Sequence, residues 1–173
     1  MANPSIHEGD HVFNGTVTVV TGLVPPDGSI TKQKIAPLAG IESSKVVHRF
    51  SQPAELFGPT TTIAALTKLL RIAKRGGTNV SFQAATSVQA TGDRSVTVDL
   101  QKSTGGGAFA SILSAPLSIP QATAVRTAVN GTISTPTFVA GDIFQVVVAL
   151  GGTTGTYPQG LLVTLDVDQD PNT

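Results

Sequence analysis

Apolar and polar residues alternate along several segments of this chain, and each such segment predicts a strand with one buried face. In 95–101, valine and leucine alternate with polar residues, which is the period-two pattern of a half-buried strand. The pattern recurs in 143–150 and in 161–168. Strands with one wet face are typical of antiparallel sheets, so the chain is predicted to be all-β, an antiparallel β-sandwich. The residues predicted to face inward are Val96, Val98, Leu100, Phe144, Val146, Val148, Leu150, Leu161, Val163, Leu165 and Val167.

Glycine and proline separate these segments. The glycines at 105–107 follow the strand at 95–101, and an apolar run resumes at 109–113, which predicts a hairpin and its continuation. The segment 45–50 is predicted to be the first strand of the main domain, followed by a proline- and glycine-marked connector at 52–59. The sandwich is therefore expected to occupy 45–173, and 1–44 to form an extended N-terminal arm.

Three further segments give less uniform signals. In 63–74 the apolar spacing fits a helix, but the glycines that follow, and the alternation of Val80, Phe82 and Ala84, favour a strand over its second half. The segment 124–134 predicts another strand, with its Asn-Gly pair as a turn or bulge.

The segment 27–45 has neither a clean strand pattern nor a clean helix pattern, yet it is rich in aliphatic residues. Such density of apolar residues marks a contact surface unless they are buried within their own domain. Two interpretations follow: a long loop packed on its own domain, or an arm ordered by a partner subunit. The candidate contact residues for a trimer partner or a capsid are Ile30, Lys32, Lys34, Ile35, Leu38, Ile41 and Lys45.

Composition narrows the classes of function. Charged residues make up only 13% of the 173 residues, against roughly 25% in typical soluble domains, which suggests that much of the surface is covered. The formal net charge is zero, so no global field recruits nucleic acid or an anionic membrane. Cysteine is absent, which excludes disulfides and thiol chemistry. The first residues lack the pattern of a signal peptide, so synthesis in a cytoplasm is expected.

One motif has the form of a zinc site. His7, Glu8 and His11 fit H-E-x-x-H, which binds zinc when it lies on a helix. Pro4 and Gly9 oppose a helix here, so a polar N-terminal arm is the better interpretation. His48, in an apolar run, is predicted to be a strand residue.

Three other groups of residues have both a functional and a structural interpretation. The cations Lys68, Arg71, Lys74 and Arg75 could contact phosphate, although Lys and Arg are also typical of a solvated edge strand. The aspartates at 166, 168 and 170 resemble the start of a calcium loop but lack its glycine and terminal glutamate. The glycine-rich 151–160 lacks the residues of a phosphate loop and is expected to link two strands. We therefore expect no metal, no cofactor and no enzymatic activity.

Three strings of the sequence carry a resemblance to a known type of protein. They are DGSITKQKIAPLAGIESSKVVHRF at 27–50, VTVDLQKSTGG at 96–106 with SILSAPLSI at 111–119, and FVAGDIFQVVVALGGTTGTYPQGLLVTLDVD at 138–168. Together they resemble a recurrent type of tailed-bacteriophage virion protein, the capsid decoration or cement protein. That resemblance implies a jelly-roll-like β-sandwich with an N-terminal arm, assembled as a homotrimer.

The resemblance also implies a function and a place. A protein of this type binds the major capsid protein on the exterior of the head and stabilises the shell, after synthesis in the bacterial host cytoplasm. Segments of phage tail fibres resemble the same arm pattern, so the alternative is a tail-fibre or receptor- or glycan-binding module. Such a module usually displays Trp or Tyr for sugar stacking, whereas this chain has no Trp and one Tyr.

Overall fold

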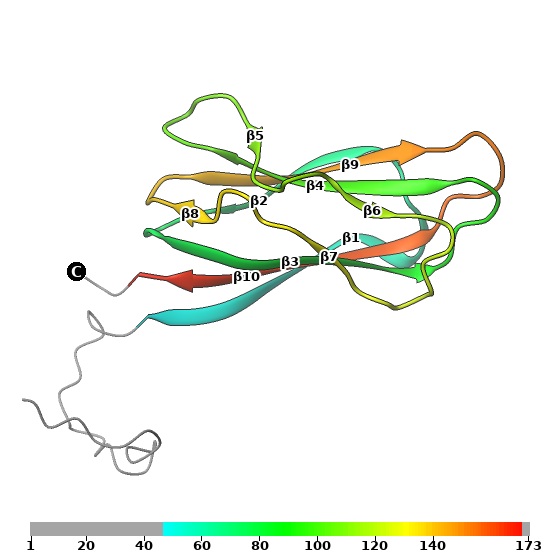
Figure 1. Ribbon diagram of the computed structural model, residues 1–173, viewed down its shortest axis with the longest axis horizontal. Helices are drawn as coiled ribbons and strands as arrows, with labels where there is room; N and C mark the ends of the chain where they lie inside the picture. Colours follow the sequence, from blue (N-terminus) through cyan, green and yellow to red (C-terminus); the bar gives the residue numbers. More distant parts are fainter. Residues whose placement is uncertain (1–46, 171–173) are drawn as a thin grey trace, which may run out of the picture. The chain divides into compact units, whose positions relative to one another are not determined.

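The computed structural model describes residues 47–170, which form ten β-strands and no helix (Figure 1). In chain order the strands are β1 (His48–Thr62), β2 (Leu66–Ile72), β3 (Gly77–Val88), β4 (Ser95–Ser103), β5 (Ala110–Ser111), β6 (Leu117–Ile119), β7 (Val129–Gly131), β8 (Thr137–Phe138), β9 (Ile143–Gly151) and β10 (Gln159–Gln169). The prediction of an all-β chain is thereby confirmed.

The strands form two antiparallel sheets, which are the two layers of a sandwich in Figure 1. In the first sheet the order is β1-β10-β3-β7, with β8 also paired to β3. In the second sheet the order is β2-β9-β4-β5, with β6 also paired to β4. Each sheet therefore has an edge strand from the start of the domain, β1 in one and β2 in the other.

The pairing is nested along the chain, which defines a jelly roll. β1 pairs with β10, β2 with β9, β3 with β7 and β8, and β4 with β5 and β6. This is the pattern of one long hairpin rolled into two sheets, closed by the pairs β10–β3 and β9–β4. The predicted jelly-roll-like β-sandwich is confirmed for the described part of the chain.

The core lies between the sheets and consists of the residues whose alternation the sequence shows. Val96, Val98 and Leu100 are fully buried in β4, as are the inward positions of β10. On β9 the predicted inward residues are buried except Leu150, which is half-buried at the end of the strand. Phe82 and Phe144 are the largest of the fully buried side chains. The predicted inward faces of these three strands are thus confirmed.

The predicted connector at 52–59 is wrong, because β1 continues through it to Thr62. Proline lacks a backbone N–H, but Pro53 lies on an edge strand that pairs only with β10, where a missing donor is tolerated. Register shifts between Glu55 and Phe57, and again between Phe57 and Thr62, absorb the irregular sequence. Glycine and proline therefore mark bulges here and not the end of the strand. His48 is the first residue of β1, as predicted.

Two details of the sheet interiors also differ from the prediction. Val80 does not share a face with Phe82, because a bulge in β3 turns Val80 outward, 41% exposed, and places Asn79 in the buried position. The strand expected over 124–134 is reduced to β7, and its Asn-Gly pair lies within regular pairing to β3. A side chain at Gly131 would contact the buried Phe82 ring and Leu113, so close packing explains this glycine.

The segment 63–74, in which the apolar spacing also fits a helix, forms the strand β2, as the glycines that follow it predict. The glycine-rich segment between β9 and β10 is a connection of two strands, also as predicted. No helix within residues 47–170 is long and apolar enough to cross a membrane.

Candidate functional site

The candidate contact residues from the sequence all precede the described part of the chain. Ile30, Lys32, Lys34, Ile35, Leu38, Ile41 and Lys45 lie outside residues 47–170, as do His7, Glu8 and His11. The described residues nonetheless show where the chain enters the sandwich. His48 at the start of β1 pairs with Gln169 at the end of β10, so the first and last described residues lie at one end of the domain. Two surfaces of the sandwich carry features suited to binding, one at this end and one on a sheet face.

The first surface is the seam between edge strands β1 and β2. Lys68 and Arg71 lie opposite Val146 and Phe144 of β9, both of which face the core, so the two cations point toward the interior of the seam. Polar contacts bridge the two sheets there: the Gln52 side-chain amide donates to the Leu70 carbonyl at 3.2 Å, and Lys68 Nζ to the Glu55 carbonyl at 3.4 Å. β2 is an edge strand, as predicted, but of its two cations only Lys68 is exposed, whereas Arg71 is half-buried.

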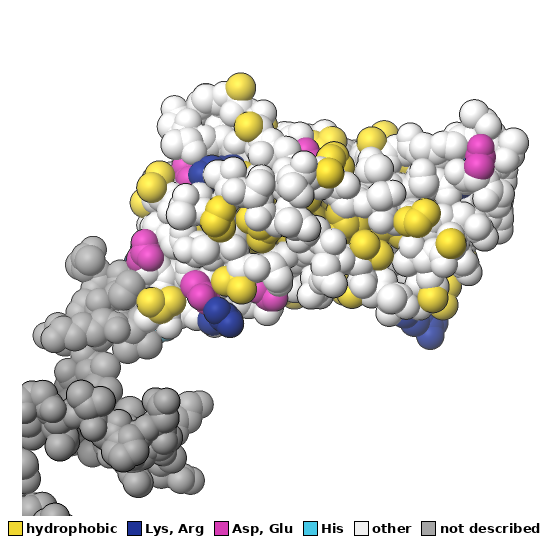
Figure 2. All heavy atoms as spheres, in the orientation of Figure 1, with side chains coloured by type: hydrophobic (Ala, Val, Ile, Leu, Met, Phe, Trp, Pro, Cys, Tyr) yellow, Lys and Arg dark blue, Asp and Glu magenta, His cyan; other side chains and the backbone are white. Residues whose placement is uncertain are grey.

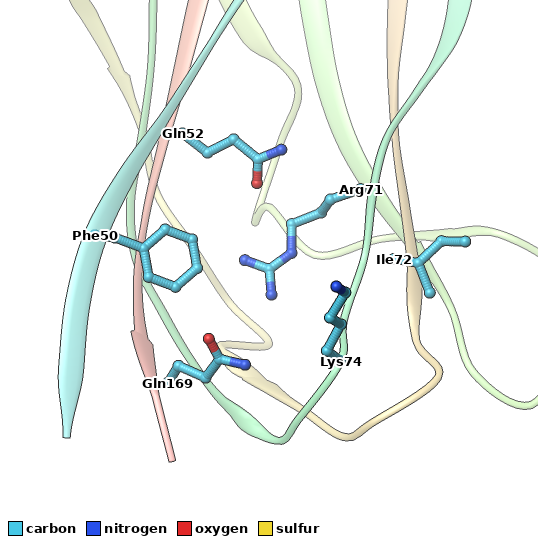
Figure 3. Close-up of a pocket in the computed structure, with 6 residues that line it drawn as sticks. All are labelled: Phe50, Gln52, Arg71, Ile72, Lys74 and Gln169. Atoms are coloured by element: carbon cyan, nitrogen blue, oxygen red, sulfur yellow. The ribbon is translucent and has the colours of Figure 1, made fainter. Parts of the chain in front are cut away.

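A pocket of about 330 Å³ opens at this seam, and we call it the Arg71 pocket (Figure 3). It is lined by Phe50, Gln52, Arg71, Ile72, Lys74 and Gln169. Figure 3 shows the Arg71 guanidinium projecting into the space between Phe50 and the side chains of Lys74 and Gln169. The pocket thus combines two cations, two amides and apolar walls, and no acidic side chain among residues 47–170 lines it.

Aromatic rings surround the Arg71 guanidinium. Its central carbon lies 5.5 Å from the ring centroid of Phe50, 5.0 Å from that of Phe138 and 5.4 Å from that of Phe144, all within cation–π range. Burial lowers the pKa of this guanidinium. Its Nη1 is buried and has no hydrogen-bond partner among the described residues. The rings hold the cation in place but offer no acceptor, so one strong donor remains unsatisfied.

The second surface is the outer face of the sheet that contains β10, which we call the Leu162 face. Leu162, 46% exposed, lies between Glu55 of β1 and Ala85 of β3. A hollow of about 170 Å³ lies on the β3 side of this leucine, lined by Gln83, Ala84, Ala85, Ala128, Leu162 and Thr164. Another of about 200 Å³ lies on the β1 side, lined by Glu55, Phe57, Pro59, Ser87, Leu161 and Leu162. A protruding leucine flanked by hollows is a shape suited to protein contact.

Beyond Leu162 the same face is polar and tied together across strands. Asp166 accepts hydrogen bonds from Ser51 of β1 and Ser81 of β3, which hold its pKa below the usual range. Asp168 accepts two hydrogen bonds from Arg49, at 2.6 and 2.7 Å, and these likewise lower its pKa. Asp166 and Asp168, two of the three aspartates of the calcium-like pattern, therefore stabilise strand pairing. Within residues 47–170 no group of three His, Asp or Glu side chains is placed to hold a metal ion.

The structure also contains a buried ion pair, Lys102 with Asp142, that the sequence did not predict. The Asp142 side chain is fully buried; it accepts a hydrogen bond from the Val139 N–H at 3.0 Å and lies 3.3 Å from Lys102 Nζ. Burial acts to raise the pKa of Asp142, but hydrogen bonds from Val139, Thr104 and Lys102 together lower it below its usual value. Lys102 also donates to the Thr137 carbonyl at 2.8 Å. This pair fixes the turn before β9 against β4.

The single tyrosine lies in the loop between β9 and β10. The Arg94 guanidinium carbon is 4.4 Å from the Tyr157 ring centroid, and Arg94 Nη1 donates to the Tyr157 hydroxyl at 2.7 Å. Asp93 accepts hydrogen bonds from the backbone N–H groups of Thr154 and Thr153, which lower its pKa to about 2. One face of the Tyr157 ring is thus occupied by Arg94, which makes it a poor platform for stacking a sugar.

Sequence reasoning missed the roles of Arg71 and Asp142 for identifiable reasons. Arg71 belongs to a run of four cations, and a register shift between Leu69 and Arg71 reverses the face that simple alternation assigns to it. Asp142 follows Gly141, and a Gly-Asp pair before a strand is typical of an ordinary turn. Only the unusual position of a single arginine within the apolar run LLRIA hints at a partly buried cation.

No protein-family model matches this chain, and neither the curated proteins nor the solved structures include a match to it.

Proposed function

We propose that this chain is a bacteriophage virion structural protein, a head decoration or cement protein that binds the capsid shell and stabilises it. The observation that carries the proposal is the nested jelly-roll pairing of the strands, an architecture common in viral capsid proteins. The same fold also serves lectins and enzymes, so fold alone does not decide the function. The three strings that resemble phage virion proteins supply the second line of support.

The surface of the sandwich is consistent with a role in assembly. Figure 2 shows a face on which uncharged side chains predominate, with apolar ones scattered along its length and charged ones in a few places. Low surface charge lowers the cost of desolvation when a large contact forms. We propose that the protein acts as a homotrimer on the capsid exterior, with the Leu162 face as one of the two surfaces that a cyclic trimer must bring together.

The polar side chains of the sandwich support a structural role over a catalytic one. Asp142 is engaged by Lys102, and Asp168 by Arg49. Asp93 is engaged by the loop between β9 and β10. Each of these carboxylates stabilises strand pairing or a turn, whereas catalysis requires a group held ready for the substrate. We therefore propose that the chain is not an enzyme.

The N-terminal segment is proposed to anchor the protein to the shell. Burial of Ile35, Leu38 and Ile41 would contribute roughly 1.5–3 kcal/mol each before the cost of ordering the segment. Three such segments per trimer would multiply the effect, because neighbouring sites on the shell repeat with fixed spacing. Lys32, Lys34 and Lys45 would then meet acidic groups at the rim of the contact.

Co-sedimentation with undecorated heads tests this function. Full-length protein should pellet with the heads, and a variant lacking residues 1–44 should remain soluble while its far-ultraviolet circular dichroism stays that of a β protein. A second variant keeps the full length but carries serine at Ile35, Leu38 and Ile41. It should lose binding to a similar degree, which would attribute the loss to these side chains and not to the shorter chain. Equal retention of the truncated and full-length proteins would show that the segment is not the anchor.

Copy number in purified virions distinguishes the head from the tail. A decoration protein should be present in a number that scales with the capsid lattice, whereas a tail fibre contributes only a few copies per particle. A low copy number would refute the decoration role and favour the tail-fibre or receptor-binding alternative.

A further inference from the structure

The Arg71 pocket has a feature that stabilising the sandwich does not explain. Arg71 Nη1 is buried without a hydrogen-bond partner among the described residues. A buried donor left unsatisfied costs about 1–3 kcal/mol, and more when the group is charged. Two other cations with partly or largely covered partners have acceptors: Arg49 has Asp168, and Lys102 has Asp142 and the Thr137 carbonyl. The guanidinium that carries this Nη1 projects into the open Arg71 pocket (Figure 3), where an acceptor from outside the sandwich can meet its accessible edge.

The charge of the pocket is one-sided. Arg71 and Lys74 contribute two positive charges, Gln52 and Gln169 contribute amides, and Phe50 and Ile72 are apolar. Two acidic residues flank Gln169 in the sequence: Asp168, which Arg49 engages at 2.6 Å, and Asp170, which does not line the pocket. Gln52 already donates to the Leu70 carbonyl, whereas Gln169 has no such bond to another described side chain. Two cations, with no carboxylate from the described part of the chain lining the same small volume, favour an anionic ligand.

The rings around Arg71 determine how that ligand would be held. Phe50, Phe138 and Phe144 place their centroids 5.0–5.5 Å from the guanidinium carbon, so the side chain is oriented before any ligand arrives. A fixed guanidinium loses less conformational freedom on binding than a free one, which favours affinity. The accessible edge of the guanidinium is planar, which matches the planar shape of a carboxylate.

We infer that the Arg71 pocket is a binding site for a carboxylate group, with the accessible edge of the Arg71 guanidinium as the hydrogen-bond donor and Lys74 as the second positive charge. A carboxylate suits the site better than a phosphate, because a single negative charge needs less desolvation in a partly apolar pocket. Inorganic phosphate, with up to two charges and tetrahedral oxygens, should bind more weakly. This inference does not depend on the proposed role in the virion.

Two sources can supply the carboxylate. One is Glu42 of the same chain, which precedes Val47, the first described residue, by five positions. Five residues span at most about 17–18 Å. Phe50 of the pocket follows Val47 by three residues, so Glu42 is close to the pocket along the chain. The other source is a carboxylate on a separate molecule. The chemistry of the site is the same in both cases, and an experiment with two arms distinguishes them.

In the first arm, full-length protein is titrated with glutarate and, separately, with inorganic phosphate, while the Arg71 Nε–H signal is followed by heteronuclear NMR. Glutarate should shift this signal saturably. Arg71→Lys, which loses the fork of donors, should weaken binding about tenfold, and Lys74→Gln should weaken it about threefold. Arg75→Gln is the matched control, since Arg75 is an exposed neighbouring cation that does not line the pocket, and it should leave binding unchanged.

The second arm is Glu42→Gln. If Glu42 occupies the pocket, this variant shifts the Arg71 signal without added ligand and binds glutarate severalfold more tightly than the unmodified protein. If the carboxylate comes from another molecule, glutarate binds the unmodified protein and Glu42→Gln changes neither quantity. Both results support the site. It is overturned if neither glutarate nor Glu42→Gln moves the Arg71 signal, if Lys74→Gln and Arg75→Gln weaken binding equally, or if phosphate binds more tightly than glutarate.

Discussion

The buried pair of Lys102 and Asp142 gives the sharpest test of how this sandwich is stabilised. The Asp142 side chain is fully buried, and the Lys102 side chain is 16% exposed. Replacing Lys102 with methionine keeps the aliphatic stem but leaves a buried carboxylate without its charged partner. Breaking a buried pair in this way costs about 3–5 kcal/mol. We expect about 3 kcal/mol, the lower end, because Lys102 retains some contact with solvent.

Asp142→Asn removes the charge with little change of shape. The asparagine can still accept from the Val139 N–H, so the loss is that of charge-assisted bonding, about 1.5–3 kcal/mol. The double variant contains no buried charge at this place and should be less destabilised than the sum of the two single variants. A coupling of about 1–2 kcal/mol is expected from residues in direct contact.

Urea unfolding of full-length protein at neutral pH measures these values, with the slope of free energy against urea unchanged between variants. The melting temperature should fall by about 3–5 °C per kcal/mol for a domain of this size. The pKa of Asp142 is lowered in the folded state, so its contribution is present above the unfolded pKa of about 3.9 and is lost as the pH falls through the folded value. The destabilisation by Asp142→Asn should therefore shrink below about pH 4. Strictly additive effects of the two substitutions, or Asp142→Asn within 0.5 kcal/mol of the unmodified protein, would refute the reasoning.

Three further predictions concern other parts of the sandwich. A methyl group at Gly77 would overlap the Asp168 carbonyl oxygen and lie 2.7 Å from Phe138 Cζ, so Gly77→Ala should destabilise the domain by about 1–3 kcal/mol in urea unfolding. The same change at Gly107, where the nearest atom would be 3.2 Å away, should cost clearly less, and equal costs would contradict the packing argument. Leu162→Glu should convert the proposed trimer into monomers, as measured by light scattering, without lowering the melting temperature. The control Leu69→Glu, at a leucine 63% exposed on β2, should leave the trimer intact. A trimer in both variants would exclude the Leu162 face as the subunit contact. The pKa values of Asp93, Asp142, Asp166 and Asp168 are lowered in the folded protein. The free energy of unfolding should therefore be constant above about pH 5 and fall below about pH 4. A free energy of unfolding that rises on acidification would contradict this.

The regular strands of this domain could be predicted from local sequence, and the reason is physical. In β4, β9 and β10 one face packs on the core and the other faces solvent, so burial imposes a period of two on neighbouring residues. That period is a property of the strand alone and needs no knowledge of its partners. The all-β class and most of the buried core therefore follow from the alternation.

The features that combine residues distant in the sequence depended on the tertiary structure. β1 extends through Pro53 because it pairs with β10, more than a hundred residues later, on one edge only. Val80 and Arg71 lie on the faces they do because of register shifts against partner strands, and a shift of one residue reverses the direction of a side chain. The Arg71 pocket needs Phe50 and Gln169 to meet Arg71 from three different strands. Local pattern determines which residues can be buried, whereas pairing and register determine which of them meet.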